Sequence, residues 1–155
     1  MTRKPFPSHD TVGSIPEQVA ISPDGKKAYV TNSGFNTVSV IDTTNDAATP
    51  LNITVGKSPT GIAITPNGKR IYVANDGNVS VIATTPDNKV TVTITFPPGS
   101  SPSGIAITPD GKKAYVTNRG DSAVSVIDIV EGSQSENKII KTFYLTPRNT
   151  GARIS

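Results

Sequence analysis

Cysteine is absent from the 155 residues, and histidine and methionine occur once each. Without cysteine, disulfides, thiolate metal sites and a cysteine nucleophile are excluded. No apolar run approaches the roughly 20 residues that a membrane helix needs. The basic N-terminal stretch "MTRKPFPSHD" has no apolar segment behind it, so neither a membrane span nor a signal peptide is expected. The net charge of +3 does not by itself indicate a nucleic-acid partner.

Recognisable catalytic patterns are also missing. The chain has no HExxH, GxSxG, Walker A or dinucleotide-binding motif. The one histidine, His9, lies in a proline-flanked tail, where a solvated side chain is the expected state. Asp42 and Asp128 share one repeat position, but Ala83 replaces them in the middle repeat, which favours a structural cap over an acid–base pair. The sequence therefore predicts a non-enzymatic chain with no cofactor and no metal site.

Glycine and proline, by contrast, are frequent at 13 each, and an internal repeat explains many of them. The stretch "SPDGKKAYVTN" (22–32) returns as "TPNGKRIYVAN" (65–75) and "TPDGKKAYVTN" (108–118), a period of 43 residues. Such a period occurs both in four-stranded propeller blades and in some helical repeats. Alternating β-branched segments such as "KVTVTITF" (89–96), without any 3.6-residue spacing, favour the blades.

Each repeat is predicted to form four short strands, A to D. Strand A is "VAIS" or "IAIT", strand B is "AYVTN" or "IYVAN", strand C is "VSVI", and strand D is the most variable segment. Between strands A and B, the Pro-Asp-Gly or Pro-Asn-Gly sequence predicts a tight turn with glycine at positive φ. Strand A alternates large and small residues, as expected where neighbouring sheets pack closely around a central axis.

The thrice-repeated "AYVTN/IYVAN" after "PDGK/PNGK", followed by "VSVI", resembles the YVTN-type β-propeller repeat of surface-layer and YncE-like proteins. The resemblance covers about residues 11–155. It implies a ring of four-stranded blades, usually seven, often in exported or cell-surface proteins. It does not imply one activity, because this fold hosts structural, binding and catalytic members alike.

The number of repeats differs from a complete ring. We expect an all-β propeller segment of three four-stranded antiparallel blades, with partial strands at both ends. The divisions are an N-terminal tail (1–10), blades at about 16–58, 59–101 and 102–149, and the start of a fourth strand A (150–155). Arg153 stands where Ala63 and Ala106 stand, which argues against normal packing of that last strand. The expected partners are therefore further blades or a second copy of the chain, with two terminal blades each exposing an apolar face. The residues predicted to form these two exposed faces are Val19 and Ile21 in blade one, and Ile105 and Ile107 in blade three.

Two sets of residues are candidate binding sites. The B–C loops contain Asn32, Asn75, Asn118, Arg119 and Asp121. "RGDS" (119–122) spells an adhesion motif, but chance occurrence is common, and asparagine here is expected mainly to bond the local structure. The other set is a periodic basic arc that could meet polyanions: Lys26, Lys27, Lys69, Arg70, Lys112 and Lys113. Lysine beside a hairpin turn is also ordinary solubility chemistry, and no aromatic residues for base stacking lie between these pairs.

Two functional hypotheses remain. The leading one is a structural or ligand-binding propeller module of a cell-surface or exported protein, whose partner would be a surface protein or a glycan. The rival is a segment of an enzyme's propeller, of lyase, lactonase or quinone- or copper-dependent oxidoreductase type, with its reactive residues outside this chain. The two sequons at Asn52 and Asn78 would matter only in an exported protein.

Overall fold

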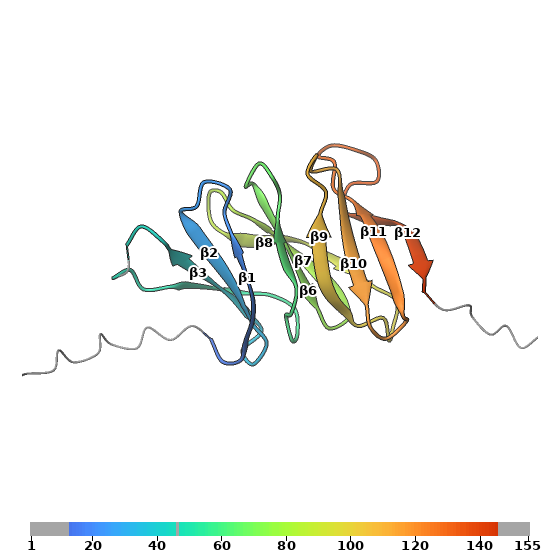
Figure 1. Ribbon diagram of the computed structural model, residues 1–155, viewed down its shortest axis with the longest axis horizontal. Helices are drawn as coiled ribbons and strands as arrows, with labels where there is room; N and C mark the ends of the chain where they lie inside the picture. Colours follow the sequence, from blue (N-terminus) through green and yellow to red (C-terminus); the bar gives the residue numbers. More distant parts are fainter. Residues whose placement is uncertain (1–12, 46, 146–155) are drawn as a thin grey trace, which may run out of the picture.

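The computed structural model describes residues 13–45 and 47–145, which form three antiparallel four-stranded sheets without a helix. The sheets stand side by side along the long axis of the molecule (Figure 1). This architecture confirms the predicted all-β propeller segment. The predicted tail (1–10) and fourth strand A (150–155) lie outside the described residues. Within those residues, no helix is long and apolar enough to cross a membrane.

Each sheet pairs its strands in sequence order, so every neighbouring pair is an antiparallel hairpin or a longer antiparallel connection. The first sheet contains β1 (Pro16–Ile21), β2 (Lys27–Asn32), β3 (Thr37–Asp42) and β4 (Leu51–Thr54). The second contains β5 (Ile62–Ile64), β6 (Arg70–Asn75), β7 (Asn78–Ala83) and β8 (Lys89–Thr95). The third contains β9 (Pro102–Ile107), β10 (Lys113–Asn118), β11 (Ala123–Asp128) and β12 (Lys138–Tyr144).

The turn between the first two strands of each sheet has the same geometry three times. Gly25, Gly68 and Gly111 have φ values of 72°, 69° and 68°, in the left-handed region that glycine adopts without steric cost. Each glycine N–H donates to the carbonyl three residues earlier at 2.8 Å. The repeated Pro-Asp-Gly or Pro-Asn-Gly sequence therefore produces the predicted tight turn.

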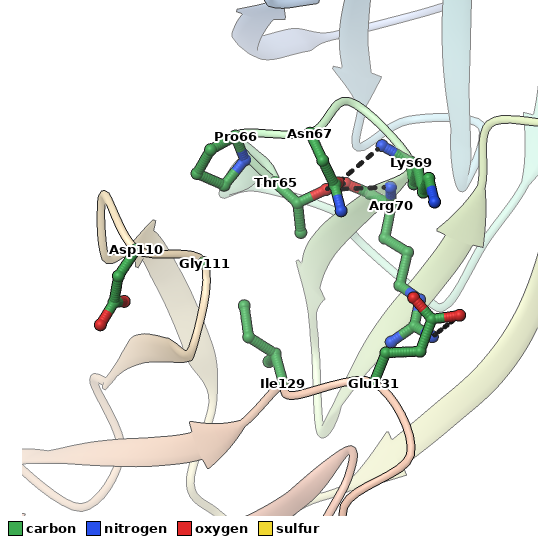
Figure 2. A pocket seen from close by; sticks show the side chains of 9 residues that line it. All are labelled: Thr65, Pro66, Asn67, Lys69, Arg70, Asp110, Gly111, Ile129 and Glu131. Carbon is green, nitrogen blue, oxygen red and sulfur yellow. Dashed lines mark hydrogen bonds and ion pairs between the residues drawn. The ribbon is translucent and has the colours of Figure 1, made fainter.

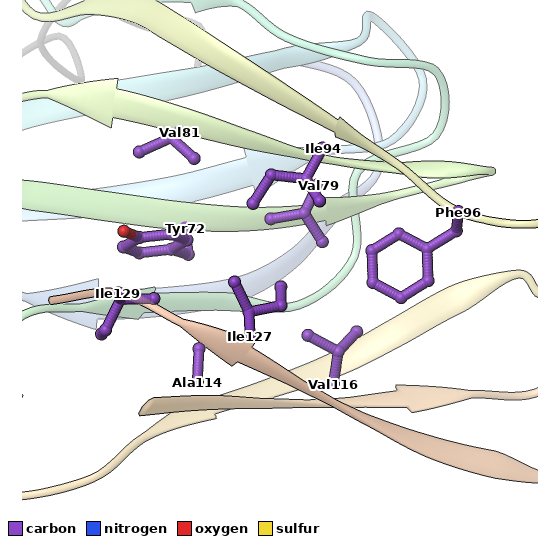
Figure 3. Packing of buried hydrophobic residues seen from close by; sticks show 9 residues of the cluster. All are labelled: Tyr72, Val79, Val81, Ile94, Phe96, Ala114, Val116, Ile127 and Ile129. Carbon is purple, nitrogen blue, oxygen red and sulfur yellow. The ribbon is translucent and has the colours of Figure 1, made fainter. Parts of the chain in front are cut away.

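The hydrophobic core lies between sheets, in two separate clusters. One cluster joins the first and second sheets around Tyr29, Ile71 and Ile82. The other joins the second and third sheets and contains Tyr72 and Ile127, which face each other across the interface (Figure 3). Because each sheet alternates its side chains between two faces, the middle sheet contributes to both clusters.

The two outer faces differ from the prediction in one respect. Val19 and Ile21 are exposed, at 56% and 52%, as predicted for the first sheet. The prediction for Ile105 and Ile107 is wrong, because both are half-buried against the cluster between the second and third sheets. Tyr115, on the opposite face, is 40% exposed instead. The physical reason is that the second and third sheets turn their strand-A isoleucines toward the preceding sheet, so the third sheet exposes its other face.

Candidate functional site

The six residues of the predicted basic arc lie at the A–B turns or at the start of the strand that follows each turn. A polar side chain of the turn accompanies each basic pair: Asp24, Asn67 and Asp110. Each accepts a hydrogen bond from the hydroxyl that begins its turn, at 2.6 to 2.7 Å. Each also accepts from the backbone N–H two residues later, at 3.0 to 3.1 Å. The basic arc is therefore interleaved with acceptors that hold the turns.

An open pocket of about 170 Å³ lies between the A–B turns of the second and third sheets. Figure 2 shows Asp110 and Gly111 on one side of it, and the 65–70 turn on the other. Arg70 extends past this turn toward Glu131, which lies in the loop after β11. The full lining consists of Thr65, Pro66, Asn67, Lys69, Arg70, Asp110, Gly111, Ile129 and Glu131.

Arg70 is held by two carboxylates of the third repeat. Its Nη1 lies 2.6 Å from Glu136 Oε1, and its Nη2 lies 3.8 Å from Glu131 Oε1. The N–H of Gly132 donates to Glu136 at 2.7 Å and is the main cause of a lowered pKa of that carboxyl. Partial desolvation raises the pKa, and Arg70 lowers it further. The central guanidinium of the basic arc is thus neutralised within the chain.

That the basic arc binds polyanions stays a prediction. Lys26, Lys69, Lys112 and Lys113 are exposed and Lys27 is half-exposed, so these ammonium groups can meet an anion. Arg70, in contrast, would have to exchange its carboxylate partners for that anion. The structure therefore favours weak and distributed contacts over a concentrated binding site.

The three asparagines of the B–C loops are buried, not displayed on the surface. Asn32, Asn75 and Asn118 end β2, β6 and β10, and their exposure is 3% or less. Each Nδ2 donates to a serine of the adjacent strand, at 2.9, 2.9 and 2.8 Å respectively. Each Oδ1 is buried without a hydrogen-bond partner, a situation normally relieved by ordered water. Their hydrogen bonds therefore have a structural role, because they join strand B to strand C in each sheet.

The "RGDS" segment (119–122) is also held by contacts within the chain. Gly120 packs so closely on the preceding link that an added Cβ would collide with the Gly99 carbonyl oxygen. Asp121 accepts a hydrogen bond from the Ser100 hydroxyl at 2.6 Å. Arg119 is exposed, but the carboxylate that would complete an adhesion motif holds the D–A link in place. Binding through Arg119 and Asp121 stays a prediction.

Sequence reasoning missed the polar network formed by the loop between β11 and β12. Tyr72 donates its hydroxyl to Asn137 Oδ1 at 2.8 Å, next to the Arg70–Glu136 ion pair. A signal was present, because "VEGSQSENK" (130–138) is the one C–D segment with two glutamates. That segment does not repeat, so the 43-residue alignment gave no reason to place it beside Arg70.

The carboxylates of the strand ends and turns are poor candidates for general bases. A base works best with a pKa near the working pH. The hydroxyls of Ser22, Thr44, Thr108 and Ser135 are the largest cause of the lowered pKa of their respective partners, Asp24, Asp42, Asp110 and Asp128. In residues 13–45 and 47–145, no group of three or more His, Cys, Asp or Glu side chains could hold a metal ion.

Residues 9–120 match the family described as the SMP-30/Gluconolactonase/LRE-like region. The chain belongs to this family. Membership agrees with the three propeller-like sheets, and the match spans most of the described residues. The narrower resemblance to YVTN-type surface-layer proteins is not confirmed by it. Among proteins of curated function, no match to this SMP-30/Gluconolactonase/LRE-like chain is found.

Solved structures with a similar fold include three named for enzymes. Hydrazine synthase of Kuenenia stuttgartiensis is 28% identical, with a TM-score of 0.74 over 92% of this chain and 40% of its own. Virginiamycin B lyase of Staphylococcus aureus is 24% identical, with a TM-score of 0.68 over 95% and 46%. A streptogramin B lyase is 18% identical, with a TM-score of 0.69 over 88% and 42%. The chain therefore spans less than half the length of each.

These comparisons correct one sequence-based conclusion. The prediction of a non-enzymatic chain is wrong, because the matching family is named for a gluconolactonase and similar structures include lyases. The error had a physical cause: the prediction relied on the absence of compact catalytic motifs. A propeller can assemble its site from single residues of many blades, and such a site leaves no local motif.

Proposed function

We propose that this chain provides three blades of a propeller enzyme of lactonase or lyase type. The observation that carries the proposal is the family match over residues 9–120, supported by the likeness to two lyase structures. The substrate class is a cyclic ester. A lactonase opens such a ring by adding water, whereas a lyase opens it by removing a proton and expelling the carboxylate.

The described blades act in this proposal mainly as scaffold. Their Asp24, Asp42, Asp110 and Asp128 carboxylates have lowered pKa values and hold turns or strand ends. The reactive groups are accordingly residues other than these four carboxylates. Placement at the cell surface rests only on the YVTN resemblance and stays a prediction.

The test is ring opening of a panel of γ- and δ-lactones, including gluconolactone, by the purified protein. Hydrolysis releases a proton at neutral pH, so a pH-stat measures the rate directly. Mass spectrometry separates the two reaction types, because hydrolysis adds the mass of one water and elimination leaves the mass unchanged. We expect a rate that saturates with lactone concentration.

Asp110→Asn is the matched control, because Asn67 occupies the same turn position in the middle repeat. We expect this variant to retain the ring-opening rate. Failure to open any lactone would overturn the proposed activity. Loss of the rate in Asp110→Asn, with an unchanged melting temperature, would instead show that a described carboxylate takes part in the chemistry.

A further inference from the structure

Each sheet has two apolar faces of different kind. The tyrosine face carries Tyr29, Tyr72 or Tyr115 from the second strand. The isoleucine face carries Ile21, Ile64 or Ile107 from the first strand. Register places these residues on opposite sides, because Tyr29, Tyr72 and Tyr115 pair with Ala20, Ala63 and Ala106, the residues next to the isoleucines.

Within the chain, a tyrosine face meets an isoleucine face twice. The tyrosine face of the first sheet packs on Ile62, Ile71 and Val73 of the second. The tyrosine face of the second packs on Ala114, Val116 and Ile127 of the third, as Figure 3 shows. Both tyrosines are at most 1% exposed. The same kind of interface is therefore built twice from non-identical residues.

One copy of each face remains without a covering sheet among the described residues. On the first sheet, the isoleucine face exposes 56% of Val19 and 52% of Ile21, whereas the equivalent Ile62 is 3% exposed. On the third sheet, the tyrosine face exposes 40% of Tyr115 and 44% of Phe143. These two faces are the complementary halves of the interface that the chain already makes internally.

A hydrogen bond between sheets follows the same pairing of faces. Thr31 accepts from the N–H of Gln18 and donates its hydroxyl across the first interface to the carbonyl of Thr60, at 2.8 Å. Thr117 on the third sheet accepts from the N–H of Gly104 in the same way, at 2.8 Å. Its hydroxyl lies 3.1 Å from the Ser103 hydroxyl and 3.4 Å from the Gly104 carbonyl, so both of these partners belong to its own sheet. The residue of the first sheet that corresponds to Thr60 is Glu17, whose carbonyl would accept this hydroxyl.

We propose that two copies of this chain associate head to tail, the third sheet of each packing its tyrosine face on the isoleucine face of the other's first sheet. Two such contacts close a two-fold ring of six sheets. In three propeller-like structures the region similar to this chain takes up only 40 to 46% of the length, so a propeller of that kind has room for a second set of three sheets. This association is independent of whether the protein opens lactones.

The first test is the solution mass by light scattering at micromolar concentration. We expect about twice 16.2 kDa for the native chain. The double variant Val19→Lys and Ile21→Lys, and separately Tyr115→Lys, should each fall to the single-chain mass with a cooperative melt retained. Phe35→Lys and Leu51→Lys are matched controls, because Phe35 and Leu51 are also exposed, at 65% and 50%. Phe35 lies in the loop between β2 and β3, and Leu51 lies on the tyrosine face of the first sheet, so neither belongs to the two uncovered faces. They should leave the mass doubled.

The decisive test mixes the two monomeric variants. The lysine double variant keeps a native tyrosine face, and Tyr115→Lys keeps a native isoleucine face. An equimolar mixture should therefore recover the doubled mass through one native contact, with a dissociation constant at least tenfold weaker than that of the native pair. Each variant alone should stay single.

Three results would overturn the proposal. A single-chain mass for the native protein would show that neither face needs a second copy. Open polymers would contradict two-fold closure. A Tyr115→Lys variant that keeps the doubled mass, while the Val19 and Ile21 double variant loses it, would show that like faces meet instead.

Discussion

Burial of a tyrosine hydroxyl group places one residue, Tyr72, under two physical demands. Its ring fills the contact between the second and third sheets, and its hydroxyl needs a hydrogen-bond partner there. Asn137 supplies that partner at 2.8 Å. Burial also raises the pKa of Tyr72, because the phenolate is poorly solvated between the sheets.

Tyr72→Phe tests this hydroxyl. We expect the free energy of unfolding at pH 7 to fall by about 0.5–1.5 kcal/mol, the net contribution of one hydrogen bond. Since the folded pKa lies above the unfolded value of about 10, the native protein loses stability as the pH rises beyond 10. The variant should lose less over that range in urea titrations. An identical alkaline loss in the variant would contradict the assignment. Tyr115→Phe serves as the exposed control at concentrations where the chain is single.

At the scale of elements, the A–B turn is the unit that repeats most faithfully. Asp24 and Asp110 each accept a hydroxyl and a backbone hydrogen bond, and Asn67 does the same without a charge. The hydroxyls are the main cause of the lowered pKa of both carboxyls. The three turns therefore share one geometry but differ in their response to acid.

The double substitution Asp24→Asn and Asp110→Asn should make the protein less sensitive to acid. A depressed folded pKa contributes stability above the unfolded value of about 3.9, and that stability is lost as the pH falls through the folded pKa. We expect the melting temperature of the variant to decline less between about pH 5 and pH 2. An equal decline of the melting temperature with falling pH in both proteins would show that these two turns do not contribute to the acid sensitivity.

The basic arc gives a prediction about the same turns. Replacement of Lys26, Lys27, Lys69, Arg70, Lys112 and Lys113 with serine should leave elution from heparin nearly unchanged. The reason is that Arg70 is already paired with Glu136 and turn carboxylates lie among the lysines. Elution at much lower salt, with a flatter dependence on salt concentration, would establish a polyanion site.

For the whole molecule, stability depends on stacking of one sheet on the next. Ile41, Ile82 and Ile127 hold the same place in strand C of the three repeats, yet only Ile82 and Ile127 are fully buried. Ile41 belongs to the first sheet's isoleucine face, which no described sheet covers. Repeat arrays behave this way because each unit gains most of its burial from its neighbours.

Alanine at these three positions should separate stacking from strand formation. We expect Ile82→Ala and Ile127→Ala to lower the free energy of unfolding by about 2–5 kcal/mol each. Ile41→Ala should cost clearly less at concentrations where the chain is single. Denaturant titrations measure all three. Equal losses would mean that the outer face of the first sheet is covered in the single chain.

The sequence by itself determined the local structure. The Pro-Asp-Gly turn, the alternation of strands and the 43-residue period are short-range properties, so three sheets of four strands were predictable. The number of repeats predicted that Val19 and Ile21, which belong to a terminal blade, would be exposed, and both are. The sequence could not assign Ile105 and Ile107, because alternation fixes two faces without saying which neighbour covers each.

Only the tertiary structure decided the direction in which the sheets stack and the ion-pair partners of Arg70. The tyrosine faces of the first and second sheets both pack on the following sheet, a choice made by contacts between residues of different repeats. The non-repeating 130–138 loop brings Glu131 and Glu136 to Arg70. The one arginine of the basic arc is therefore paired with acidic side chains, although the repeat presents it as equivalent to the lysines. Long-range contacts of this kind have no signature in the repeat, since they join segments that the period does not relate.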